Sequence, residues 1–478
     1  MNYLFLKIIY IFILFSFSLS EMIFLYSHMR HGTRGPGFGE KNNSPINTDI
    51  YGVEWEGNGE ITKIGIRMLY LLGYLTRKRY QTFLSSIQNP LEIRILSSKT
   101  RRTVMSAQAL IQGMFPISSF EMFSEKEKEK MFPPIKIDNE DIDDIMSKSD
   151  IGSFEKNQVI PIHLLDKEEN KLLLTDKSVC PNTYNYKLKA KNDKIFENFY
   201  IKLNNTYGRQ LKEYFNQTNY EFLFNIGTVF RVCDVFEADY ANNKDLSNFE
   251  KIGIDLQNFY NLCVEFKTLF LFNGECNEEI SPIAMTKTMP RIIDWMEKRI
   301  NIDKNKEMLY NKFDNPKVVI YSGHDKTLAP FELFMKKAFN TPLEYPKFGS
   351  SLFLELHRNN SIMDKEPTLK DYYIEYYLNG RFVLREQYEI FLKKIKGQLW
   401  TQEKINKFCI KENISEIIYI TVATFISLVI VLVIIWIYFH MNKRKIHVKQ
   451  KKDIPSRDDS DTAEKTSEEL INLDNNQF

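Results

Sequence analysis

Short apolar runs that end in polar or charged residues recur along this chain. The run "MIFLY" (22–26) leads into the basic turn "SHMRHGTRGP" (27–36), "LEIRIL" (91–96) leads into "SSKTRRT", and "KVVIYSGHD" (317–325) ends on a histidine and an aspartate. Runs of this length and composition are typical of buried β-strands. Each of them therefore predicts a strand whose carboxyl end carries polar side chains.

Helical periodicity follows these runs. Thr62 can cap a helix that ends near Tyr80, and a second helix is predicted to begin near Arg102. The first helix has apolar residues at three-to-four spacing on one face: Ile64, Met68, Leu71, Leu72 and Leu75. Further helices are predicted over 280–300 and 326–339, and closing strands over 350–358, 371–379 and 381–387. This alternation of strands and helices predicts an α/β fold.

The alternation breaks in the middle of the chain. A charged stretch near 125–150 is interpreted as a solvated loop, and the segment that follows is mostly helical and irregular. We therefore expect a helical cap, residues 126–280, inserted between two parts of one α/β catalytic domain, residues 21–125 and 281–412. In the cap, Asp234 and the acids at 237–239 are interpreted as loop residues without a specific role, with a place on the cap side of the pocket as the alternative.

The first 20 residues have the features of a secretory signal peptide. Lys7 precedes an apolar stretch from Ile8 to Phe17, and small residues stand at Ser18 and Ser20. Such a segment is removed during secretion, so residues 1–20 are expected to lie outside the fold. An anchor helix is the alternative, because little positive charge precedes the apolar stretch.

An unbroken apolar run of 23 residues, 417–439, is long enough to span a bilayer. A cluster of basic residues follows it: Lys443, Arg444, Lys445, Lys449, Lys451 and Lys452. Because basic residues mark the cytosolic side, the sequence predicts a single-pass type I membrane protein of the secretory pathway with a cytosolic tail, 440–478. The remainder would be lumenal or extracellular, in a lysosome or at the cell surface. A buried helix of a soluble protein would not explain the basic flank.

Composition and charge narrow the function classes. Of the 478 residues 43% are hydrophobic, so the chain can bury a large core, and its net charge of +2 provides no general attraction for nucleic acid. Five cysteines precede the apolar run, where disulfides can persist, and none has the spacing of a metal site. They are Cys180, Cys233, Cys263, Cys276 and Cys409, and which four pair is left open. Five sequons allow glycosylation: Asn42, Asn204, Asn216, Asn359 and Asn413.

The three predicted strand ends hold the candidate functional residues. In open α/β sheets, ligands bind beyond the carboxyl ends of strands and beside helix N-termini. Bringing these ends together gathers six residues: Arg30, His31, Arg34, Arg102, His324 and Asp325. Buried cations are costly unless an anion meets them, so a negatively charged ligand is expected here. His28 is interpreted as a packing residue or one that supports a site residue from behind, and His163 and His357 as structural or surface residues.

A phosphoryl group fits this set of side chains. Guanidinium groups bind phosphate oxygens through paired, charge-assisted hydrogen bonds, and they lower the pKa of a neighbouring imidazole. His31 would then be neutral and nucleophilic even in acid, and Gly32 would let the backbone approach the ligand closely. Asp325 could protonate the departing alkoxide. These residues need neither a metal nor a cofactor.

Three segments resemble the histidine acid phosphatases, a branch of the histidine phosphatase superfamily. "RHGTRGP" (30–36) fits the RHGxRxP motif, "YSGHDKTL" (321–328) resembles the His-Asp motif, and "SSKTRRTVMSAQALIQGMFP" (97–116) resembles the segment that carries a further arginine. The resemblance covers about residues 22–390, loosely in the middle, and the membrane-anchored layout is similar to the lysosomal acid phosphatases.

The resemblance implies a fold and a reaction. The fold would be a central mixed β-sheet flanked by helices, as in phosphoglycerate mutase, with an inserted, mostly helical cap. His31 would form a phosphohistidine, and Asp325 would donate the proton. Four residues would bind the phosphoryl oxygens: Arg30, Arg34, Arg102 and His324. The expected function is hydrolysis of small phosphate monoesters without a cofactor, and the oligomeric state is left open, a homodimer included.

Two departures from the family pattern are visible. Lys99 stands where the family usually has an aspartate, which changes the local charge but none of the six candidate residues. The usual disulfide partners are also incomplete, although Cys233 lies in a family-like context.

Two other functions fit part of the pattern. A phytase-like enzyme would share the RHGxRxP motif, but residues 200–280 mix acids and bases, whereas a highly charged substrate calls for extra cations. A lumenal receptor for phosphorylated ligands would keep the arginines and lose the nucleophile or the acid. Because His31 and Asp325 are both present, an enzyme is favoured.

Overall fold

The computed structural model describes residues 20–37, 46–85, 90–115, 160–217, 222–305, 315–359, 367–409 and 414–451. The chain divides into two compact units, Met1–Ile410 and Lys411–Phe478. The first unit contains every described strand and all helices but one. The second contains a single long helix, α18 (Ile414–Lys451).

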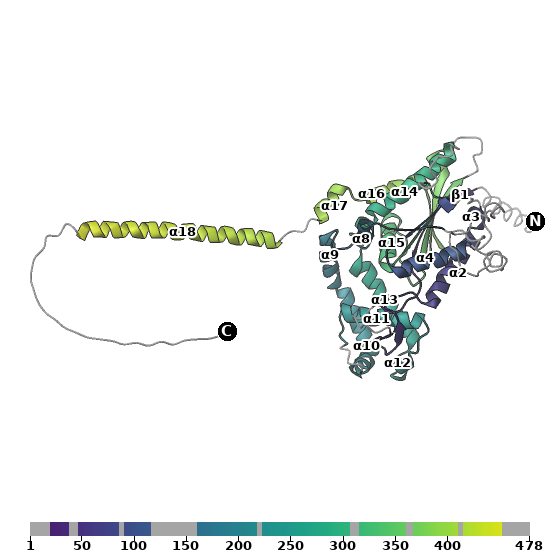
Figure 1. Ribbon diagram of the computed structural model, residues 1–478, viewed down its shortest axis with the longest axis horizontal. Helices are drawn as coiled ribbons and strands as arrows, with labels where there is room; N and C mark the ends of the chain where they lie inside the picture. Colours follow the sequence, from purple (N-terminus) through teal and green to yellow (C-terminus); the bar gives the residue numbers. More distant parts are fainter. Residues whose placement is uncertain are drawn as a thin grey trace, which may run out of the picture. The chain divides into compact units, whose positions relative to one another are not determined.

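One mixed sheet of seven strands forms the centre of the first unit (Figure 1). Its strands are β1 (Ser20–Arg30), β4 (Ile93–Ser97), β5 (Ile162–Leu164), β6 (Val318–Gly323), β7 (Ser351–Asn359), β8 (Tyr372–Leu378) and β9 (Arg381–Gln387). They lie in the order β5-β4-β6-β1-β7-β8-β9. The pairs from β5 to β1 are parallel, and the pairs from β1 to β9 are antiparallel. The predicted α/β fold with a mixed sheet is confirmed.

Helices surround this sheet on both faces. The helices before the cap are α2 (Lys63–Arg79), α3 (Gln81–Ser85) and α4 (Arg101–Met114), with a hairpin of β2 (Ile46–Thr48) and β3 (Glu54–Glu56). Those between β5 and β6 are α8 (Lys167–Leu173), α9 (Pro181–Lys191), α10 (Lys194–Gln217), α11 (Ile226–Ala241), α12 (Ser247–Lys251), α13 (Leu256–Leu269) and α14 (Ser281–Asn305). The last ones are α15 (Asp325–Phe339), α16 (Tyr388–Gln398) and α17 (Gln402–Cys409), and short helical turns are η1 (Pro90–Glu92), η3 (Phe270–Glu275) and η5 (Leu369–Asp371).

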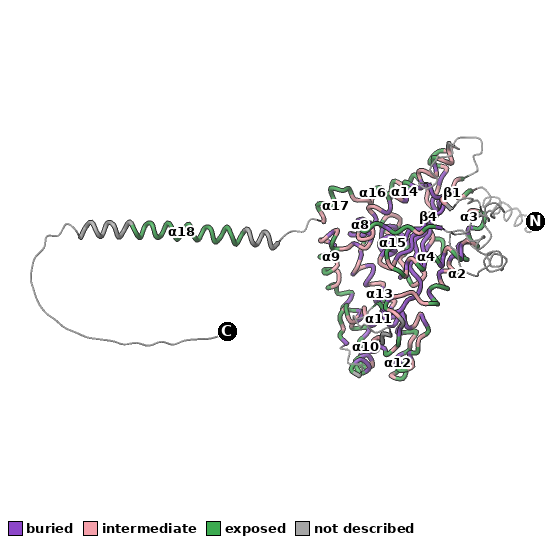
Figure 2. Tube along the Cα trace, viewed as in Figure 1, coloured by how far each residue is buried: buried purple, intermediate pink, exposed green. Residues whose placement is uncertain are grey.

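Alternate residues of the strands face two different cores. On one side, Leu25, Met29 and Ile95 pack with apolar residues of α2 and α4. On the other side, Phe24, Tyr26 and Tyr321 pack with residues of α14, α15 and α16. Because side chains alternate along a strand, a sheet covered on both faces needs near-continuous apolar runs. Figure 2 shows the resulting buried stretches, in purple, running through the sheet and its neighbouring helices.

Helix α2 begins after Thr62, which accepts a hydrogen bond from the backbone of Gly65, as the sequence predicted. Only part of the predicted apolar face is buried, however: Met68 and Leu72 pack partly against the core. Leu71 and Leu75 are 43% and 58% exposed, whereas Leu69 is fully buried between glycines. A Cβ on Gly73 would lie 2.1 Å from the carbonyl oxygen of Leu110 in α4. The two helices therefore pack backbone against backbone, and the small residues decide which face is buried.

The cap helices pack around an aromatic core, to which Tyr51 from the segment before α2 also belongs. The ring of Phe236 in α11 lies 5.8 Å from Phe249 and 4.7 Å from Phe259, and residues of α10 and α13 complete the cluster. The described part of the segment between β5 and β6 is thus largely helical. The boundaries at 126 and 280 remain predictions, and the charged stretch up to residue 159 lies outside the described residues.

The cysteine pairing that the sequence left open is Cys180–Cys409 and Cys233–Cys263, with Cys276 free and buried. The second disulfide joins α11 to α13. The first joins the residue before α9 to the end of α17. The cap helices α11 and α13 are therefore joined to each other by a covalent bond.

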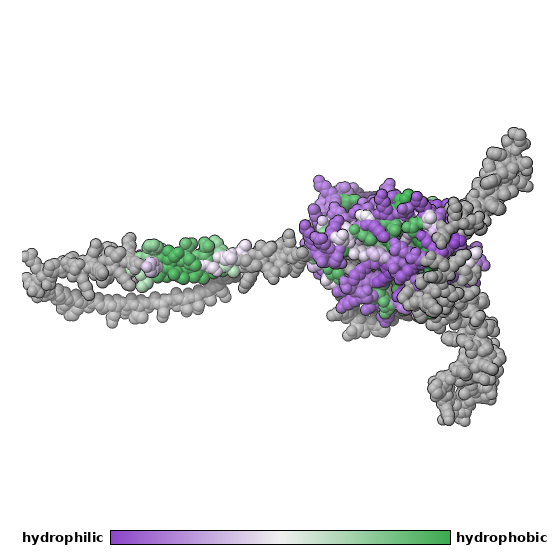
Figure 3. Space-filling view, turned by 90° about the horizontal axis from the view of Figure 1, so that it is seen from above, coloured by the Kyte–Doolittle hydropathy of each residue, from purple (hydrophilic) through white to green (hydrophobic). Residues whose placement is uncertain are grey.

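The predicted segments at the two termini are only partly described. Residues 1–19, which make up most of the predicted signal peptide, and residues 452–478 of the predicted tail lie outside the described residues. In the second unit, Thr421–Met441 of α18 form an apolar band (Figure 3). Among the described helices, this one alone is long and apolar enough to cross a membrane. Its type I orientation remains a prediction.

Candidate active site

The turn after β1 packs directly on the start of α2. Arg30 is the last residue of β1 and fully buried, and His31 and Gly32 follow it. A Cβ on Gly32 would lie 2.3 Å from the carbonyl oxygen of Gly65, and one on Gly65 would lie 2.1 Å from that of Thr33. Only glycines allow this approach. This close contact holds the His31 imidazole at the carboxyl ends of the parallel strands.

His324 lies beside His31 because their strands are parallel neighbours. Arg30 is in register with Gly323, and the backbone N–H of His31 donates to the Gly323 carbonyl at 3.0 Å. His324 follows as the N-cap of α15, and the two imidazole rings are 5.4 Å apart. Thr327 supports His324, because Thr327 Oγ1 accepts from the His324 backbone N–H at 2.9 Å. His28 lies behind Thr327, with its Nε2 2.9 Å from the same oxygen.

Arg102 reaches the same place from the first turn of α4. Strand β4 is the other parallel neighbour of β6, so α4 begins close to His324. Arg102 Nη2 lies 3.4 Å from His324 Nδ1, and Ser98 Oγ lies 2.9 Å from His324 Nε2. Burial and the charge of Arg34 lower the pKa of Arg102 to about 10, so the guanidinium stays charged in acid.

The environment of His31 keeps its ring neutral. Burial lowers the pKa of His31 well below its ordinary value, and the charges of His324 and the three arginines lower it further. Nδ1 lies 2.8 Å from the carbonyl oxygen of Gly32. Because a carbonyl only accepts hydrogen bonds, Nδ1 carries the proton and Nε2 carries the lone pair. A neutral imidazole with a free Nε2 is able to act as a nucleophile.

Arg30 and Asp325 form an ion pair at the pocket. Arg30 Nη2 and Asp325 Oδ2 are 3.1 Å apart, and the guanidinium carbon of Arg30 lies 4.1 Å above the ring of Phe348. Arg30 Nη1 also donates to the carbonyl of Pro346 at 2.7 Å. Burial alone would raise the pKa of Asp325, but the charge of Arg30 outweighs it, with Lys267, and lowers that pKa to about 2.

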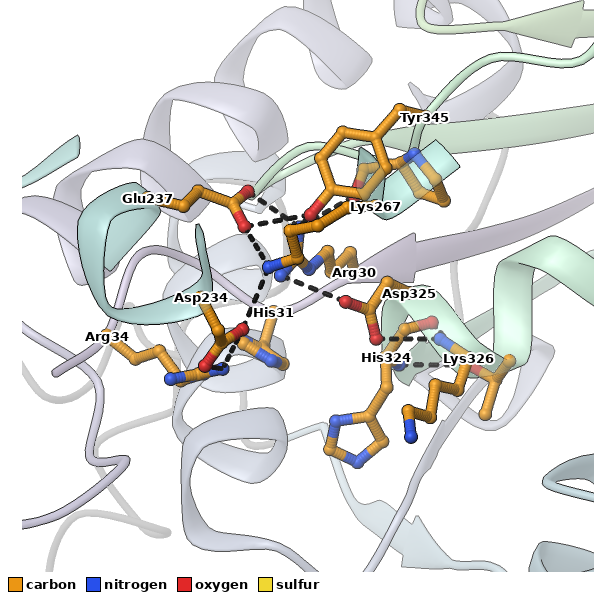
Figure 4. Close-up of polar contacts among 12 residues, drawn as sticks. Arg30, His31, Arg34, Asp234, Glu237, Lys267, His324, Asp325, Lys326 and Tyr345 are labelled. Carbon is orange, nitrogen blue, oxygen red and sulfur yellow. Dashed lines mark hydrogen bonds and ion pairs between the residues drawn. The ribbon is translucent and has the colours of Figure 1, made fainter. Parts of the chain in front are cut away.

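All six predicted residues therefore lie around one site, at the carboxyl ends of β1, β4 and β6. Figure 4 shows further residues on the cap side, of which the sequence suggested only Asp234 and Glu237, as the alternative to loop acids without a role. Asp234 and Glu237 are not loop acids: they lie on α11, 4% and 2% exposed. Asp234 accepts from Arg34 at 3.0 and 3.1 Å, and Glu237 accepts from Arg30 at 3.2 Å.

Lys267 and Tyr345 complete this network. Lys267 Nζ donates to Asp234 at 2.8 Å and to Glu237, and the Tyr345 hydroxyl donates to Glu237 at 2.8 Å. A signal for the acids was present in "TVFRVCDVFEADYA", where carboxylates interrupt an otherwise apolar helix pattern. Acids at buried helix positions require cationic partners. Nothing in the sequence near Lys267 or Tyr345 indicated that these residues were the partners.

A possible metal-binding group lies elsewhere. Among the described residues, Glu355, His357 and Glu375 could hold an ion. Glu355 already accepts from Tyr80 at 2.7 Å, and Glu375 accepts from Arg385 at 2.7 Å. In register, Glu355 lies opposite Leu25, five residues before Arg30, so this group is not part of the candidate active site.

Comparisons with known proteins identify a matching family. The family model "Histidine phosphatase superfamily (branch 2)" matches residues 16–379. The lysosomal acid phosphatase of Xenopus laevis is 25% identical over 341 residues, 71% of this chain and 67% of the relative. The human lysosomal acid phosphatase is 25% identical over 350 residues, 70% of this chain and 66% of the relative. The chain thus spans about two thirds of the length of these relatives.

Among solved structures, the apo form of a Hafnia alvei phytase is similar, with a TM-score of 0.51. The likeness covers 80% of this chain and 98% of the phytase at 11% sequence identity. At that identity the likeness indicates the fold alone.

Proposed function

The chain belongs to branch 2 of the histidine phosphatase superfamily, and from that premise we propose that it is an acid phosphatase that hydrolyses phosphate monoesters through a phosphohistidine on His31. The observation that carries the proposal is the state of His31: a neutral ring, with Nδ1–H bound to the Gly32 carbonyl and the lone pair on Nε2. This nucleophile lies among guanidinium groups suited to phosphoryl oxygens.

In the first step, His31 Nε2 attacks phosphorus. The N–P bond forms as the ester P–O bond breaks, and Asp325 transfers its proton to the departing alkoxide oxygen. Arg30, Arg34, Arg102 and His324 would hold the three phosphoryl oxygens while the charge spreads over them. In the second step, a water molecule attacks phosphorus and gives its proton to Asp325. The P–N bond then breaks, which releases inorganic phosphate and restores the neutral ring.

Asp325 must hold a proton in the first step, although the free pocket keeps it ionised. Its pKa of about 2 depends on the positive charge of Arg30, 3.1 Å away. A bound phosphoryl group adds negative charge beside the carboxyl and competes for the same guanidinium. Both changes raise the pKa of Asp325. We therefore expect turnover to be favoured in acid and to fall as the pH rises and the carboxyl loses its proton.

Three further observations support a lumenal, membrane-anchored enzyme. The relatives are lysosomal acid phosphatases, two disulfides stabilise the first unit, and α18 can cross a membrane. We place the catalytic unit on the lumenal or extracellular side accordingly. The phytase-like alternative has no support beyond the fold, and no observation in the cap favours it.

The test is turnover by the full-length chain in detergent. Para-nitrophenyl phosphate is assayed from pH 4 to pH 8, with and without EDTA, for the wild type and His31→Ala. We expect turnover that favours acid, is unaffected by EDTA and is lost in His31→Ala. The exposed His163 on β5 provides the control, because His163→Ala removes a histidine that does not contact the site. Turnover that disappears with EDTA would contradict the mechanism, and phosphate binding without turnover would identify a receptor.

A further inference from the structure

Lys267 is a buried cation with no access to substrate. It lies near the end of α13, and its side chain is 2% exposed. Its ammonium group contacts Asp234 and Glu237, which lie three residues apart on α11 and so point from the same face of that helix. Here these two are called the cap carboxylates. Its N–H groups are directed at the cap carboxylates, and its charge also reaches Asp325, whose pKa it helps to lower.

The cap carboxylates in turn hold the two arginines of the RHGxRxP motif. Both carboxylate oxygens of Asp234 accept from Arg34 Nη2, and Glu237 Oε1 accepts from Arg30 Nη1. Figure 4 shows this chain of contacts from Lys267 through the carboxylates to the motif arginines. Arg30 and Arg34 have long, flexible side chains, so a fixed anion behind each guanidinium determines where its remaining N–H groups point.

Charge balance makes Lys267 necessary to this arrangement. Three cations, Arg30, Arg34 and Lys267, meet three carboxylates, Asp234, Glu237 and Asp325. Without the lysine, two buried carboxylates one helical turn apart would repel each other and add negative charge beside a phosphate site. Burial alone would raise the pKa of Asp234 and Glu237, but Lys267 and the arginines outweigh it and keep both pKa values low.

A covalent bond fixes the position of the lysine. The Cys233–Cys263 disulfide joins the residue before Asp234 to the residue four positions before Lys267. Four residues along a helix bring side chains back to the same face, so Cys263 and Lys267 both face α11. The disulfide and the ion pairs of Lys267 are therefore neighbouring cross-links between α11 and α13.

From these contacts we propose that Lys267 is a positioning residue: through the cap carboxylates it aligns the two motif arginines for the phosphoryl group. This inference rests on the proposed phosphatase function and adds a residue outside the motifs that carry it. Phosphate affinity is the readout. Loss of a lysine that only stabilised the cap would lower the amount of folded protein, but the folded protein would bind phosphate with unchanged affinity.

The experiment measures inhibition by inorganic phosphate and turnover of para-nitrophenyl phosphate with the full-length chain. We expect Lys267→Met to raise the inhibition constant of phosphate at least tenfold. The double variant Lys267→Met/Glu237→Gln removes one charge of each sign and restores the balance. If positioning matters, the double variant also stays at least fivefold above the wild type, because Arg30 has lost the charge of one of the two carboxylates that hold it.

The matched control is a surface ion pair of the same cap, Lys202 and Glu265, 2.6 Å apart and 52% and 44% exposed. Lys202→Met/Glu265→Gln should leave the inhibition constant unchanged. An unchanged constant in folded Lys267→Met, or a double variant restored to the wild-type value, overturns the proposal. If Lys267→Met does not fold, the double variant decides alone. A wild type that neither turns over nor binds phosphate refutes the proposed function instead.

Discussion

Replacing Asp325 by Asn removes both the proton that the carboxyl can donate and the negative charge that it carries when ionised. The carboxylate pairs with Arg30 at 3.1 Å, and its other oxygen accepts from the backbone of Lys326 at 2.8 Å. Asn has the same shape and can keep the second contact. It can neither donate a proton to a leaving alkoxide nor oppose an incoming phosphate. The variant therefore tests both consequences at once, with little disturbance of the packing.

The two effects have opposite signs. Loss of a general acid costs roughly 10²–10⁴-fold in rate, or about 2.7–5.5 kcal/mol, when the leaving group is a basic alkoxide. Para-nitrophenolate is a weak base and needs little protonation, so its rate should fall less than about tenfold. A phosphate charge roughly 5 Å from the carboxylate is repelled by about 3 kcal/mol at an effective dielectric constant of about 20. Phosphate should consequently inhibit Asp325→Asn at a concentration lower by a factor on the order of 100.

The assay compares kcat for an alkyl and an aryl phosphate monoester, together with the inhibition constant of phosphate. Asp294→Asn on α14 is the control, since that carboxylate is 55% exposed and pairs with Lys298 one turn away. Equal slowing of both esters would exclude Asp325 as the proton donor. Weaker phosphate inhibition would refute the charge argument, because it would mean that the carboxylate helps to bind the anion.

Two stability predictions follow from buried groups near the site. Asp239 and Asp49 both accept from Trp55 Nε1 at 3.0 Å, and burial, with the Asp49 charge, raises the pKa of Asp239 to about 9. Because this folded-state value lies above the unfolded one, the stability it contributes is complete below about pH 4 and is lost as the pH rises towards 9. The thermal midpoint should decrease as the pH rises from 5 to 8.5, and it should decrease less steeply in Asp239→Asn. Equal slopes of the midpoint against pH in the two proteins would argue against this. Gly32→Ala places a methyl group 2.3 Å from the Gly65 carbonyl and should abolish folding or turnover, whereas Gly397→Ala, with nothing within 4 Å, should change neither. A fully active Gly32→Ala would show that α2 can move away.

The strands and the ends that carry the six candidate residues could be predicted because their signals are local. Each strand is a continuous apolar run, and each run ends in charged residues within a few positions. The caps behave similarly: Thr62 starts α2 as expected, and His324 starts α15 directly after β6. The buried face of α2 was not predictable in this way. Its small residues set the helix distance, and of the predicted apolar residues Ile64, Leu71 and Leu75 stay exposed.

The sequence by itself determined the α/β order of elements, the membrane-spanning candidate and the residues of the phosphate-binding motifs, because hydrophobic period, turn residues and motif spacing are properties of neighbouring positions. The tertiary structure alone decided which cysteines pair, which face of α2 is buried, and that Lys267 supports Arg30 and Arg34 through α11. Those contacts join residues 30 to 229 positions apart. Any buried charge requires a partner, but only the folded chain selects which of many distant opposite charges it will be.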